Sequence, residues 1–402
     1  ASDLIVRGNM IGVDPAGSGS LAPPGEGISV NSGELPSAAV EATIAGNEIR
    51  MEGGVAIAQQ GFGATISDNE ISGAETGIAT SEPTGEHGNL IEDNAIEGLQ
   101  ASGILVENNL NVILGNEIFG AGGAGIWIHG SLPFGVTENL VGGDAAADEN
   151  VITGSGGDAI EISSIKATEN EVARNRGIAN NGLFIDLVAA GVEPKGPNNG
   201  IEPPAIATPA QASASGSGAL AGAKVRVFRK QTGAAGELES FLGEATADAG
   251  GNWKVIYDGA VPAGTIVAAT QTNEAGGTSE LALATTVAGA GSADGGRGGG
   301  DAGSSAGAAS GSDSGPRIRP RTTIVKMPKT RSRSRTARFR FKSDELGSVF
   351  LCKLDDKPFD LCKSPKKYEH LKLGTHVFEV RAVDPAGHVD ASPASKKFTV
   401  LG

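Results

Sequence analysis

Apolar residues recur in a short, regular phrase over the first two hundred residues of the chain. The phrase combines an Asn-x-Ile step, a Gly-rich turn and a Gly-Ile-x-Ile stretch, as in residues 115–128. Its Asn anchors have spacings of 22, 25 and 22 residues and then recur twice more; they are Asn47, Asn69, Asn94, Asn116, Asn150 and Asn170. A repeat of this length predicts a solenoid, in which each repeat forms one coil.

Each Gly-Ile-x-Ile stretch alternates apolar and other residues, which predicts a half-buried strand. Further short apolar runs precede the anchors, for example at 64–66 and 89–91, so we expect about three short strands per coil. A single coil cannot bury its Ile face, but stacked coils can, with parallel strand pairing. The pattern therefore predicts a parallel β-helix.

The Asn anchors have a separate interpretation. Asn tolerates a left-handed backbone and its amide can bond the Asn of the next coil, so we interpret the anchors as an internal ladder, not as ligands.

The pattern changes after Pro203 and Pro204, where short alternating strands separated by turns predict a β-sandwich. The stretch 288–315 consists almost wholly of Gly, Ala, Ser and Asp, which cannot bury enough apolar surface to fold. Alternating strands resume beyond it. We expect an all-β chain with four parts: a parallel β-helix at 1–204, an immunoglobulin-like sandwich at 205–287, a disordered linker at 288–320 and a basic immunoglobulin-like sandwich at 321–402.

Several phrases of the first part resemble bacterial secreted right-handed parallel β-helix repeat proteins, the pectate-lyase-like β-solenoids. They are GNMIGVDPAGSGSL at 8–21, NLVGGDAAADENVITGSGGDAIEI at 139–162 and NNGLFIDLVAAGVEP at 180–194. The resemblance covers roughly residues 1–200 and implies a right-handed β-helix.

The strings GEATADAGGNWKV and GTIVAATQTNEAGGTSEL resemble bacterial immunoglobulin-like domains, although Gly277 stands where Asn is usual. The phrase VFLCKLDDKPFDLCKSPKKYEHLKLGTHVFEVRAVDPAGHVDASPA resembles a module of secreted bacterial proteins, with His388 at a position that is usually Asn. In that module Cys352 and Cys362 would form a disulfide, which implies an oxidising compartment.

Charge is unevenly distributed along the chain. Residues 1–316 contain 12 Lys and Arg against 38 Asp and Glu, a balance of −26, whereas residues 317–402 contain 20 against 9, a balance of +11; together they give the net −15. A basic terminal module on an acidic body favours contact with an anionic partner, such as wall polymer or acidic glycan, although self-pairing with the acidic body is an alternative.

No run of about 18 apolar residues is present, so we expect no transmembrane segment. The chain opens inside a coil and without Met. We therefore expect further sequence upstream, with a secretion signal and a cap for the solenoid, and an extracellular or cell-surface location.

Alignment of the Gly-Ile-x-Ile stretches predicts two columns of outward-facing side chains. The first contains Leu105, Trp127, Glu161 and Phe184, and the second contains Glu107, His129, Ser163 and Asp186. An exposed Trp beside carboxylates commonly holds a sugar ring. The candidate glycan-binding residues are therefore Trp127, Glu161, Glu107 and Asp186. The alternative is that Trp127 and Phe184 pack beneath a loop or against the next domain, which we favour for Phe184.

Catalytic chemistry has weaker support. Glu161 with Asp158, or Glu107 with His129, could form an acid/base pair or a metal site, but no dedicated spacing motif accompanies them. The acidic runs 93–97 and 144–149 could hold Ca²⁺, yet they lack the loop spacing of a calcium motif. We predict no metal site and no cofactor, with calcium as the only exception considered.

Known enzyme signatures of β-helices are missing. A lyase needs an Arg or Lys base beside calcium-binding carboxylates, and the first 200 residues contain six basic residues, none in a catalytic phrase. The motifs of pectin-type hydrolases are absent, except for one Asp in Gly157-Asp158-Ala159 where two are expected. The fold alone proves no activity. The sequence favours a non-enzymatic protein and leaves a polysaccharide lyase or glycoside hydrolase open.

The terminal module carries the run Arg331, Arg333 and Arg335, separated by Ser, which predicts an anion-binding segment. No aromatic interleaving or base-reading module accompanies it, so we expect no sequence-specific binding of nucleic acid. The sequence thus favours a monomeric, extracellular adhesin or display rod that contacts polysaccharide or anionic wall polymer. A carbohydrate-active enzyme and a purely structural envelope spacer remain as alternatives.

Overall fold

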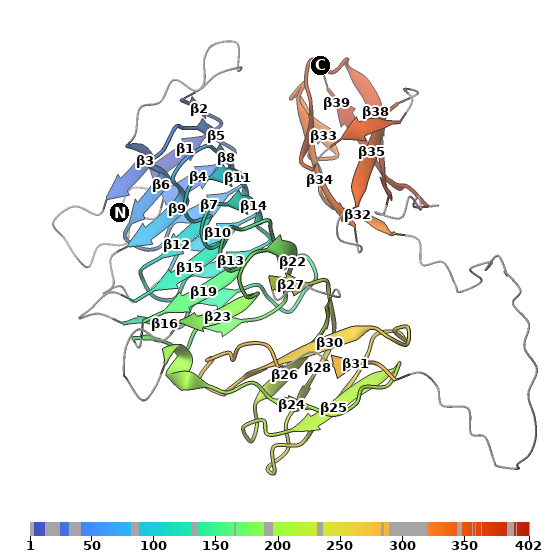
Figure 1. Cartoon of the computed structure of the whole chain (residues 1–402). Helices are drawn as coiled ribbons and strands as arrows, with labels where there is room; N and C mark the ends of the chain where they lie inside the picture. The colour runs from blue at the N-terminus through green and yellow to red at the C-terminus, as the bar shows by residue number, and fades with distance from the viewer. Residues whose placement is uncertain are drawn as a thin grey trace, which may run out of the picture. The chain divides into compact units, whose positions relative to one another are not determined.

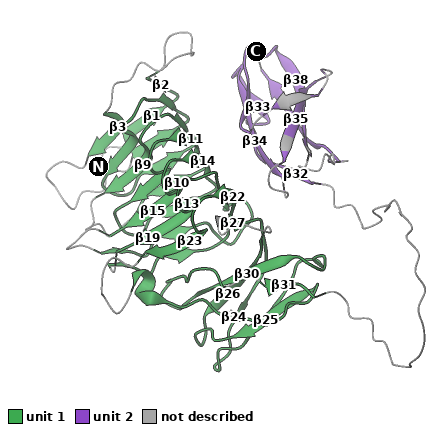
Figure 2. Ribbon diagram, in the orientation of Figure 1, with its two compact units in different colours: residues 1–289 green, residues 290–402 purple. Residues whose placement is uncertain are grey.

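The computed structural model divides the chain into two compact units, residues 1–289 and 290–402 (Figure 2). It describes residues 4–12, 25–31, 42–81, 88–130, 135–164, 166–188, 196–230, 236–282, 285–288, 320–343, 348–355, 357, 359–362, 364–383, 390 and 392–401. The predicted β-helix and first sandwich both lie in unit 1. The predicted boundaries after residues 204, 287 and 320 stay predictions, and residues 289–319 of the predicted linker lie outside the described residues.

Three parallel sheets run side by side along unit 1 and confirm the predicted β-helix (Figure 1). The first contains β1 (Leu4–Arg7), β4 (Ala42–Ala45), β7 (Thr65–Ser67), β10 (Leu90–Glu92), β13 (Val112–Leu114), β17 (Leu140–Val141) and β21 (Glu171–Val172). The second contains β2 (Met10–Ile11), β5 (Glu48–Arg50), β8 (Glu70–Ser72), β11 (Ala95–Leu99), β14 (Glu117–Ala121), β18 (Asn150–Thr153) and β22 (Asn175–Asn180). The third contains β3 (Glu26–Asn31), β6 (Val55–Gln60), β9 (Thr76–Ser81), β12 (Ile104–Val106), β15 (Ile126–His129), β19 (Ile160–Ser163) and β23 (Ile185–Val188). A short pair, β16 (Val136–Thr137) and β20 (Ala167–Thr168), lies beside them.

Aligned aliphatic side chains fill the interior of the β-helix. In the third sheet one inward column is isoleucine in every coil: Ile28, Ile57, Ile78, Ile104, Ile126, Ile160 and Ile185. All seven are buried in one core cluster with the inward residues of the other two sheets. Strict stacking of one residue type explains how coils of so few residues exclude water.

Two asparagine ladders run through the turns of the β-helix. In the first, each side-chain Nδ2 donates to the Oδ1 of the next at 2.9 Å, along Asn9, Asn47, Asn69, Asn94, Asn116, Asn150 and Asn175. The second connects Asn89, Asn111, Asn139 and Asn170 at 2.8–2.9 Å. The predicted internal ladder is therefore confirmed, except that Asn170 belongs to the second ladder and Asn175 takes its place in the first.

The left-handed backbone falls one residue before these anchors, not on them. Gly46, Asp68, Asp93 and Gly115 have φ between 57° and 65°. The amide of each following Asn is thereby free to donate to the Asn of the next coil, as Asn69 does to Asn94. The expectation that the anchors themselves use left-handed backbone was wrong for these positions.

Antiparallel strands after the β-helix form two small facing sheets, as predicted for a sandwich. One contains β24 (Ala205–Ile206), β25 (Ser213–Ser217) and β29 (Trp253–Ile256); the other contains β26 (Lys224–Lys230), β28 (Ser240–Thr246), β30 (Ile266–Thr272) and β31 (Thr285–Thr286). A further strand, β27 (Gly236–Leu238), pairs antiparallel with β22 and thus extends a β-helix sheet into the sandwich. A 3-10 helix, η1 (Pro197–Gly200), lies in the connection between the two parts.

A buried arginine joins the sandwich to the last coils of the β-helix. The side chain of Arg226, on β26, is 0% exposed and donates to Glu171 of β21 at 2.6 Å and to Thr272 at 3.1 Å. The guanidinium of Arg174 lies 4.3 Å from the ring centroid of Phe241 in the sandwich. Because the end of a solenoid exposes unpaired strands and apolar rungs, a domain docked there serves as its cap.

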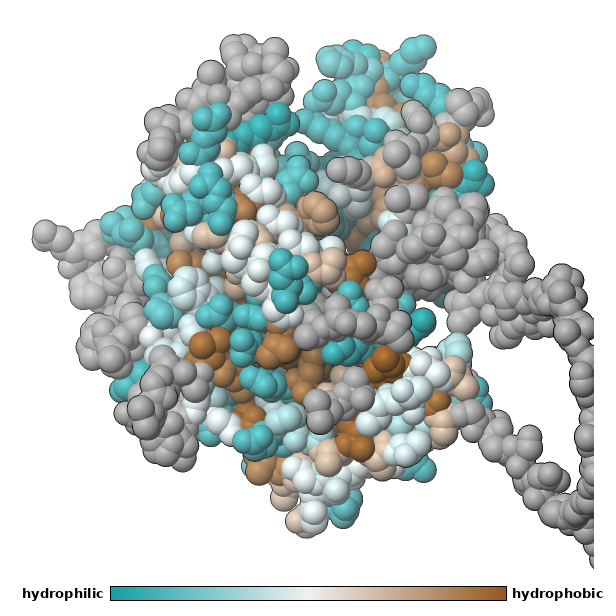
Figure 3. Space-filling model, in the orientation of Figure 1, coloured by the Kyte–Doolittle hydropathy of each residue, from teal (hydrophilic) through white to brown (hydrophobic). Residues whose placement is uncertain are grey.

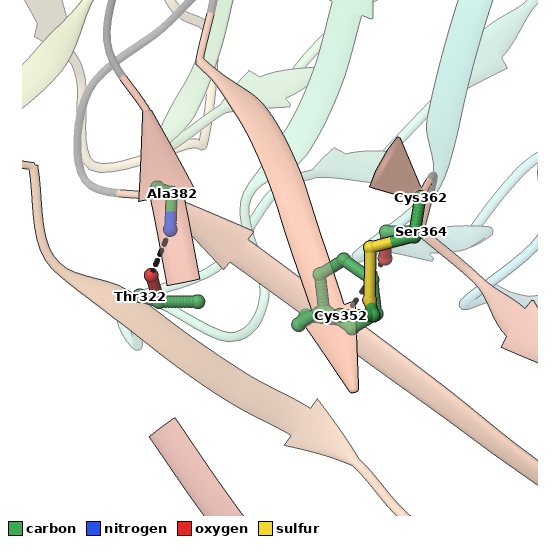
Figure 4. Close-up of a disulfide and its surroundings, with 6 residues drawn as sticks. Thr322, Cys352, Cys362, Ser364 and Ala382 are labelled. Carbon is green, nitrogen blue, oxygen red and sulfur yellow. Dashed lines mark hydrogen bonds between the residues drawn. A yellow bond between two sulfur atoms is a disulfide. The ribbon is translucent and has the colours of Figure 1, made fainter. Parts of the chain in front are cut away.

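Unit 2 is a second sandwich, with antiparallel strands except for the parallel pair of β33 and β39. Its sheets are β32 (Thr322–Lys326), β34 (Ala337–Ser343) and β37 (Lys366–Tyr368), and β33 (Arg331–Ser332), β39 (Ala394–Val400), β38 (Gly374–Val383), β35 (Val349–Leu354) and β36 (Asp360–Cys362). Stacked aromatic rings fill the core, with Phe339 and Phe378 4.0 Å apart. The expected disulfide joins Cys352 and Cys362 across the hairpin of β35 and β36 (Figure 4).

Candidate functional site

The third sheet of the β-helix presents a column of outward side chains that changes character along its length. Register pairs Leu105 with Trp127, Trp127 with Glu161, and Glu161 with Asp186. Toward the other end the column continues through Ala79, Ala58 and Ser29, which are small. The large and charged side chains thus gather over the coils nearest the sandwich.

Two predicted positions in these columns were wrong at the last coil. Asp186, not Phe184, follows Glu161, and Val188, not Asp186, follows Ser163. The alignment took Gly182-Leu183-Phe184-Ile185 as a standard phrase, which sets Leu183 beside Ile160. In the structure Ile185 pairs with Ile160, so the strand starts two residues later than expected. Because side chains alternate between faces, a shift of two residues keeps Asp186 on the outer face. It leaves Phe184 just before β23, where its carbonyl accepts from the amide of Ile160 at 3.0 Å.

Phe184 is fully buried at a position that other coils fill with Gly or Ala. A Cβ on the equivalent Gly125 would lie 2.2 Å from Cγ2 of Ile152 in the next coil, so only a small residue fits there. At the final coil no further coil supplies such atoms, and Phe184 joins the same buried cluster as Phe228 and Leu238 of the sandwich. The preferred interpretation of Phe184 as a packing residue is therefore correct.

Trp127 is held in place by a hydroxyl from the neighbouring coil. Its Nε1 donates to Oγ of Ser163 at 2.7 Å, and the same oxygen lies 3.0 Å from Nδ1 of His129. The indole and imidazole centroids are 4.7 Å apart, with planes tilted by 46°. Trp127 and His129 are half-buried, whereas Ser163 is buried beneath them. These contacts fix the orientation of an aromatic surface at the outside of the coil.

Carboxylates from two coils and from the sandwich accumulate beside this aromatic pair. Burial raises the pKa of Asp186 to about 6, reinforced by the negative charges of Asp158, Glu280 and Glu161 and by a hydrogen bond with Glu280. Burial and Asp158 also raise the pKa of Glu161, against opposing hydrogen bonds from Ser163 and Trp127. Asp158 accepts from the amide of Leu183 at 2.6 Å. Asp186 and Glu161 therefore bind protons more readily than isolated carboxylates do.

Glu280 belongs to the sandwich and was missed by the sequence analysis. Its Oε1 accepts from the amide of Leu187, at the end of β23, at 3.1 Å. No local motif indicates this residue, because only the docking of the sandwich onto the last coil brings it there. The carboxylate group is thus shared between the two parts of unit 1.

The other chemical candidates fare differently. His129 contacts Ser163, whereas the backbone amide of Glu107 donates to Thr80, and no hydrogen bond joins Glu107 to His129 in the described structure. In the run 144–149, Glu149 binds Arg174 at 2.8 Å and Asp148 accepts from Ala145, so these carboxylates serve the protein itself. Within the described ranges, no group of three or more His, Cys, Asp or Glu is arranged to hold a metal ion.

The predicted anion-binding arginines lie in unit 2, at β33 and the turn after it. Arg331, Arg333 and Arg335 are all exposed, and Nε of Arg335 also donates to the carbonyl of Leu371 at 2.7 Å. They belong to a different compact unit from the site on the β-helix. Within the described ranges, no helix has the length and apolar character needed to cross a membrane.

Comparison with known proteins supports the fold. Residues 22–141 match the family model described as "Right handed beta helix region", which assigns the hand of the β-helix. The N-terminal part of the chain is therefore a right-handed parallel β-helix. No curated protein matches the sequence.

Three solved structures show distant likeness. Fibronectin(III)-like modules of Clostridium thermocellum CbhA share 16% identity, with 49% of this chain and 93% of that chain covered and a TM-score of 0.18. The BSP domain of a biofilm-associated protein shares 12%, covering 50% and 29%, with a TM-score of 0.16. Tailspike protein 2 of the Escherichia coli O157:H7 bacteriophage CAB120 shares 9%, covering 72% and 65%, with a TM-score of 0.21. The chain spans less than two thirds of the last two, and such TM-scores support no functional argument.

Proposed function

We propose that the protein is a non-enzymatic, extracellular adhesin or display rod whose β-helix binds a glycan across the face that carries Trp127. One observation supports this most: the indole of Trp127 is held by Ser163 at the surface, in register with Glu161 and next to Leu105. A fixed ring at the surface loses little conformational entropy when a ligand stacks on it.

The neighbouring groups suit sugar hydroxyls. The C–H face of a sugar ring packs on an aromatic ring, while carboxylates accept hydrogen bonds from its hydroxyls. Glu161 and Asp186 continue the Trp127 column at the spacing of successive strands, about 4.8 Å. The view of unit 1 in Figure 3 mixes hydrophobic and hydrophilic residues over the described surface, which fits contact with a polar chain better than burial of a broad apolar partner.

The proposed location and second contact come from unit 2. A disulfide such as Cys352–Cys362 persists in oxidising surroundings, which supports an extracellular or cell-surface location. The exposed arginines of the 331–335 turn support contact with an anionic wall polymer. In this proposal the β-helix presents the glycan-binding face and unit 2 supplies the anchor.

The test compares two outward-facing aromatic residues on different sheets, Trp127 on the third and Phe119 on the second. Full-length chain, Trp127→Ala and Phe119→Ala are applied to a glycan array at one salt concentration. Phe119 is 61% exposed on β14 of the second sheet and serves as the matched control. We expect Trp127→Ala to lose about tenfold or more in affinity, on the scale of the roughly 1–3 kcal/mol that alanine substitution removes when a nucleic-acid base stacks on an aromatic side chain. We expect Phe119→Ala to bind as wild type. If both variants lose the same affinity, or if neither loses affinity, the proposed binding face is wrong.

A glycoside hydrolase is the second candidate, and the raised pKa of Asp186 favours it. A carboxyl that stays protonated near pH 6 beside ionised neighbours is the usual arrangement for a general acid, with a second carboxylate as partner. Reducing ends and ultraviolet absorbance, measured on the polysaccharides that bind, distinguish the two functions. If wild type releases products and both Asp186→Asn and Glu161→Gln do not, the protein is a hydrolase and the adhesin proposal is wrong. If neither binding nor product release is detected, the structural envelope spacer becomes the favoured alternative.

A further inference from the structure

Two separate segments that carry basic residues meet at one end of unit 2. Thr399 of β39 pairs on one side with Arg331 of β33 and on the other with Thr375 of β38, which brings the two segments to the same sheet. Beyond the strands, Arg335 and Leu371 exchange two bonds: Nε of Arg335 donates to the Leu371 carbonyl at 2.7 Å, and the Leu371 amide donates to the Arg335 carbonyl at 2.9 Å. The next residue, Lys372, is exposed. The arginine turn, residues 331–335, and the loop 370–373 are therefore held together by hydrogen bonds.

The serines between the arginines order the turn. The amide of Ser334 donates to Oγ of Ser332 at 3.0 Å, and the amide of Thr336 donates to Oγ of Ser334 at 3.2 Å. Such hydroxyl turns restrict the backbone locally. From residue 317 to residue 343 the sequence contains no Asp or Glu, so no acidic residue of this segment neutralises the arginines.

His376 lies directly behind the loop and contacts an acceptor with each ring nitrogen. Its Nδ1 is 2.7 Å from Oδ2 of Asp355, and its Nε2 is 2.9 Å from the carbonyl oxygen of Lys372. An ionised carboxylate and a carbonyl only accept, and a neutral imidazole carries one N–H. Both bonds therefore form together only when the ring is protonated on both nitrogens. Neutral His376 must release one of them.

We propose that Arg331, Arg333, Arg335 and Lys372 form one binding surface for a linear polyanion, and that protonated His376 fastens the Lys372 side of it. This deepens the anionic contact of the proposed function and rests on it. The ligand chemistry is a repeating phosphate or carboxylate, because guanidinium groups bind both in bidentate geometry and an ammonium adds a point charge.

The pH dependence follows from the groups around His376. The bond to the Lys372 carbonyl, followed by Asp355, raises the pKa of His376 against the opposing effect of burial. Burial and Asp355 raise the pKa of Tyr368 to about 12, so that phenol stays neutral. The ring of Phe398 on β39 also faces His376, with the two ring centroids 5.4 Å apart, and it carries no charge. Lys and Arg keep their charge between pH 5 and pH 8. The loop is thus fastened below the pKa of His376 and released above it.

The surface is tested on the full chain with inorganic polyphosphate and with polygalacturonate, which separate phosphate from carboxylate ligands. The double variant Arg331→Gln with Arg333→Gln is compared with Lys254→Gln with Lys357→Gln, which removes the same charge from two other exposed positions. We expect the first to lower the slope of log affinity against log salt by about 1.5, for two lost contacts, and the second to keep the wild-type slope. Equal slopes for both variants would overturn the surface.

The role of protonated His376 in holding the Lys372 loop is tested by measuring affinity for the same polyanions from pH 5.5 to pH 8.5. We call this proton-dependent contact the lock. Wild type should weaken as pH rises, His376→Gln should show a flat profile, and His370→Gln should keep the wild-type profile. His370 is exposed in the same loop and carries no buried contact of this kind, so it controls for plain loss of charge. A wild-type profile in His376→Gln, or a flat one in His370→Gln, would overturn the role of His376.

Amide hydrogen exchange of residues 371–374 in the free chain gives an answer that needs no ligand. After correction for intrinsic rates, exchange should accelerate as pH rises through the pKa of His376 in wild type and stay constant in His376→Gln. Exchange that is independent of pH in wild type overturns the lock. If the lock is observed but neither polyanion binds at any pH, the proposed anionic contact fails while the proton-dependent loop stands.

Discussion

At the scale of single residues, asparagine amides position the coils of unit 1 together with isoleucine packing. Asn116 is completely buried, donates to Asn150 at 2.9 Å and to the Ile91 carbonyl at 2.9 Å, and accepts from Asn94 at 2.9 Å. Each asparagine in the ladder therefore supplies an acceptor to the coil before it and a donor to the coil after it. Removing one member leaves buried donors and acceptors in two adjacent coils without partners.

Asn116→Ala should therefore destabilise unit 1 by about 3 kcal/mol or more, since each unsatisfied buried polar group costs roughly 1–3 kcal/mol. Asn181→Ala, at an exposed position in a turn, should change it by less than about 0.5 kcal/mol. Urea unfolding of the full chain, followed by far-ultraviolet circular dichroism, measures both. Similar midpoints for the two variants would show that the ladder is not a source of stability.

The carboxyl of Asp186 gives a second prediction at this scale. Its pKa is raised from 3.8 to about 6 in the folded chain, so the folded state binds more protons than the unfolded state between these values. Stability from this group is thus complete below about pH 4 and is lost as pH rises toward 6. Asp186→Asn should flatten that part of the profile and raise the melting temperature of unit 1 at pH 7. Calorimetry between pH 3.5 and pH 7 decides it, and an unchanged slope would contradict the assignment.

At the scale of elements, the strands and their stacking follow from the sequence, but register at the end of the solenoid does not. Periodic Ile and Asn specify each coil locally, because every coil meets a nearly identical neighbour. Phe184 and Asp186 break the pattern because their coil meets the sandwich instead. Glu280 reaches the site for the same reason, and no spacing in the sequence records that contact. The column Leu105, Trp127 and Glu161 was predictable, whereas its continuation was set by docking.

Docking of the sandwich should depend on Arg226. Its guanidinium is fully buried between Glu171, Thr272 and Glu244, the last at 3.4 Å. Arg226→Met leaves these groups without their partner, and breaking a buried pair in this way costs roughly 3–5 kcal/mol. Arg229→Met, where the arginine side chain is 38% exposed, breaks a pair with Glu239 within the sandwich and leaves the contacts with the β-helix intact, so it serves as the control. Limited proteolysis should cut the 205–287 region only in Arg226→Met. Resistance equal to wild type would contradict the cap.

At the scale of the whole molecule, the two compact units stabilise themselves by different means. Unit 1 relies on stacked coils and a docked sandwich, whereas unit 2 is a smaller sandwich with a disulfide. A cross-link between residues ten apart stabilises a fold by about 2–4 kcal/mol. Reduction, or Cys352→Ser with Cys362→Ser, should lower the calorimetric transition of unit 2 and leave that of unit 1 in place. A joint shift of both transitions would show that the units do not unfold independently.

The central claim is that a glycan binds over Trp127 without being cleaved, and quenching of tryptophan fluorescence by iodide tests it most directly. The chain has two tryptophans, of which Trp253 is buried at 4% exposure and Trp127 is half-buried on the outer face. Iodide should therefore quench Trp127 preferentially. Saturation with a polysaccharide selected on the array should remove the quenchable fraction while no reducing ends appear. Binding with unchanged quenching, or protection accompanied by released products, would contradict the account.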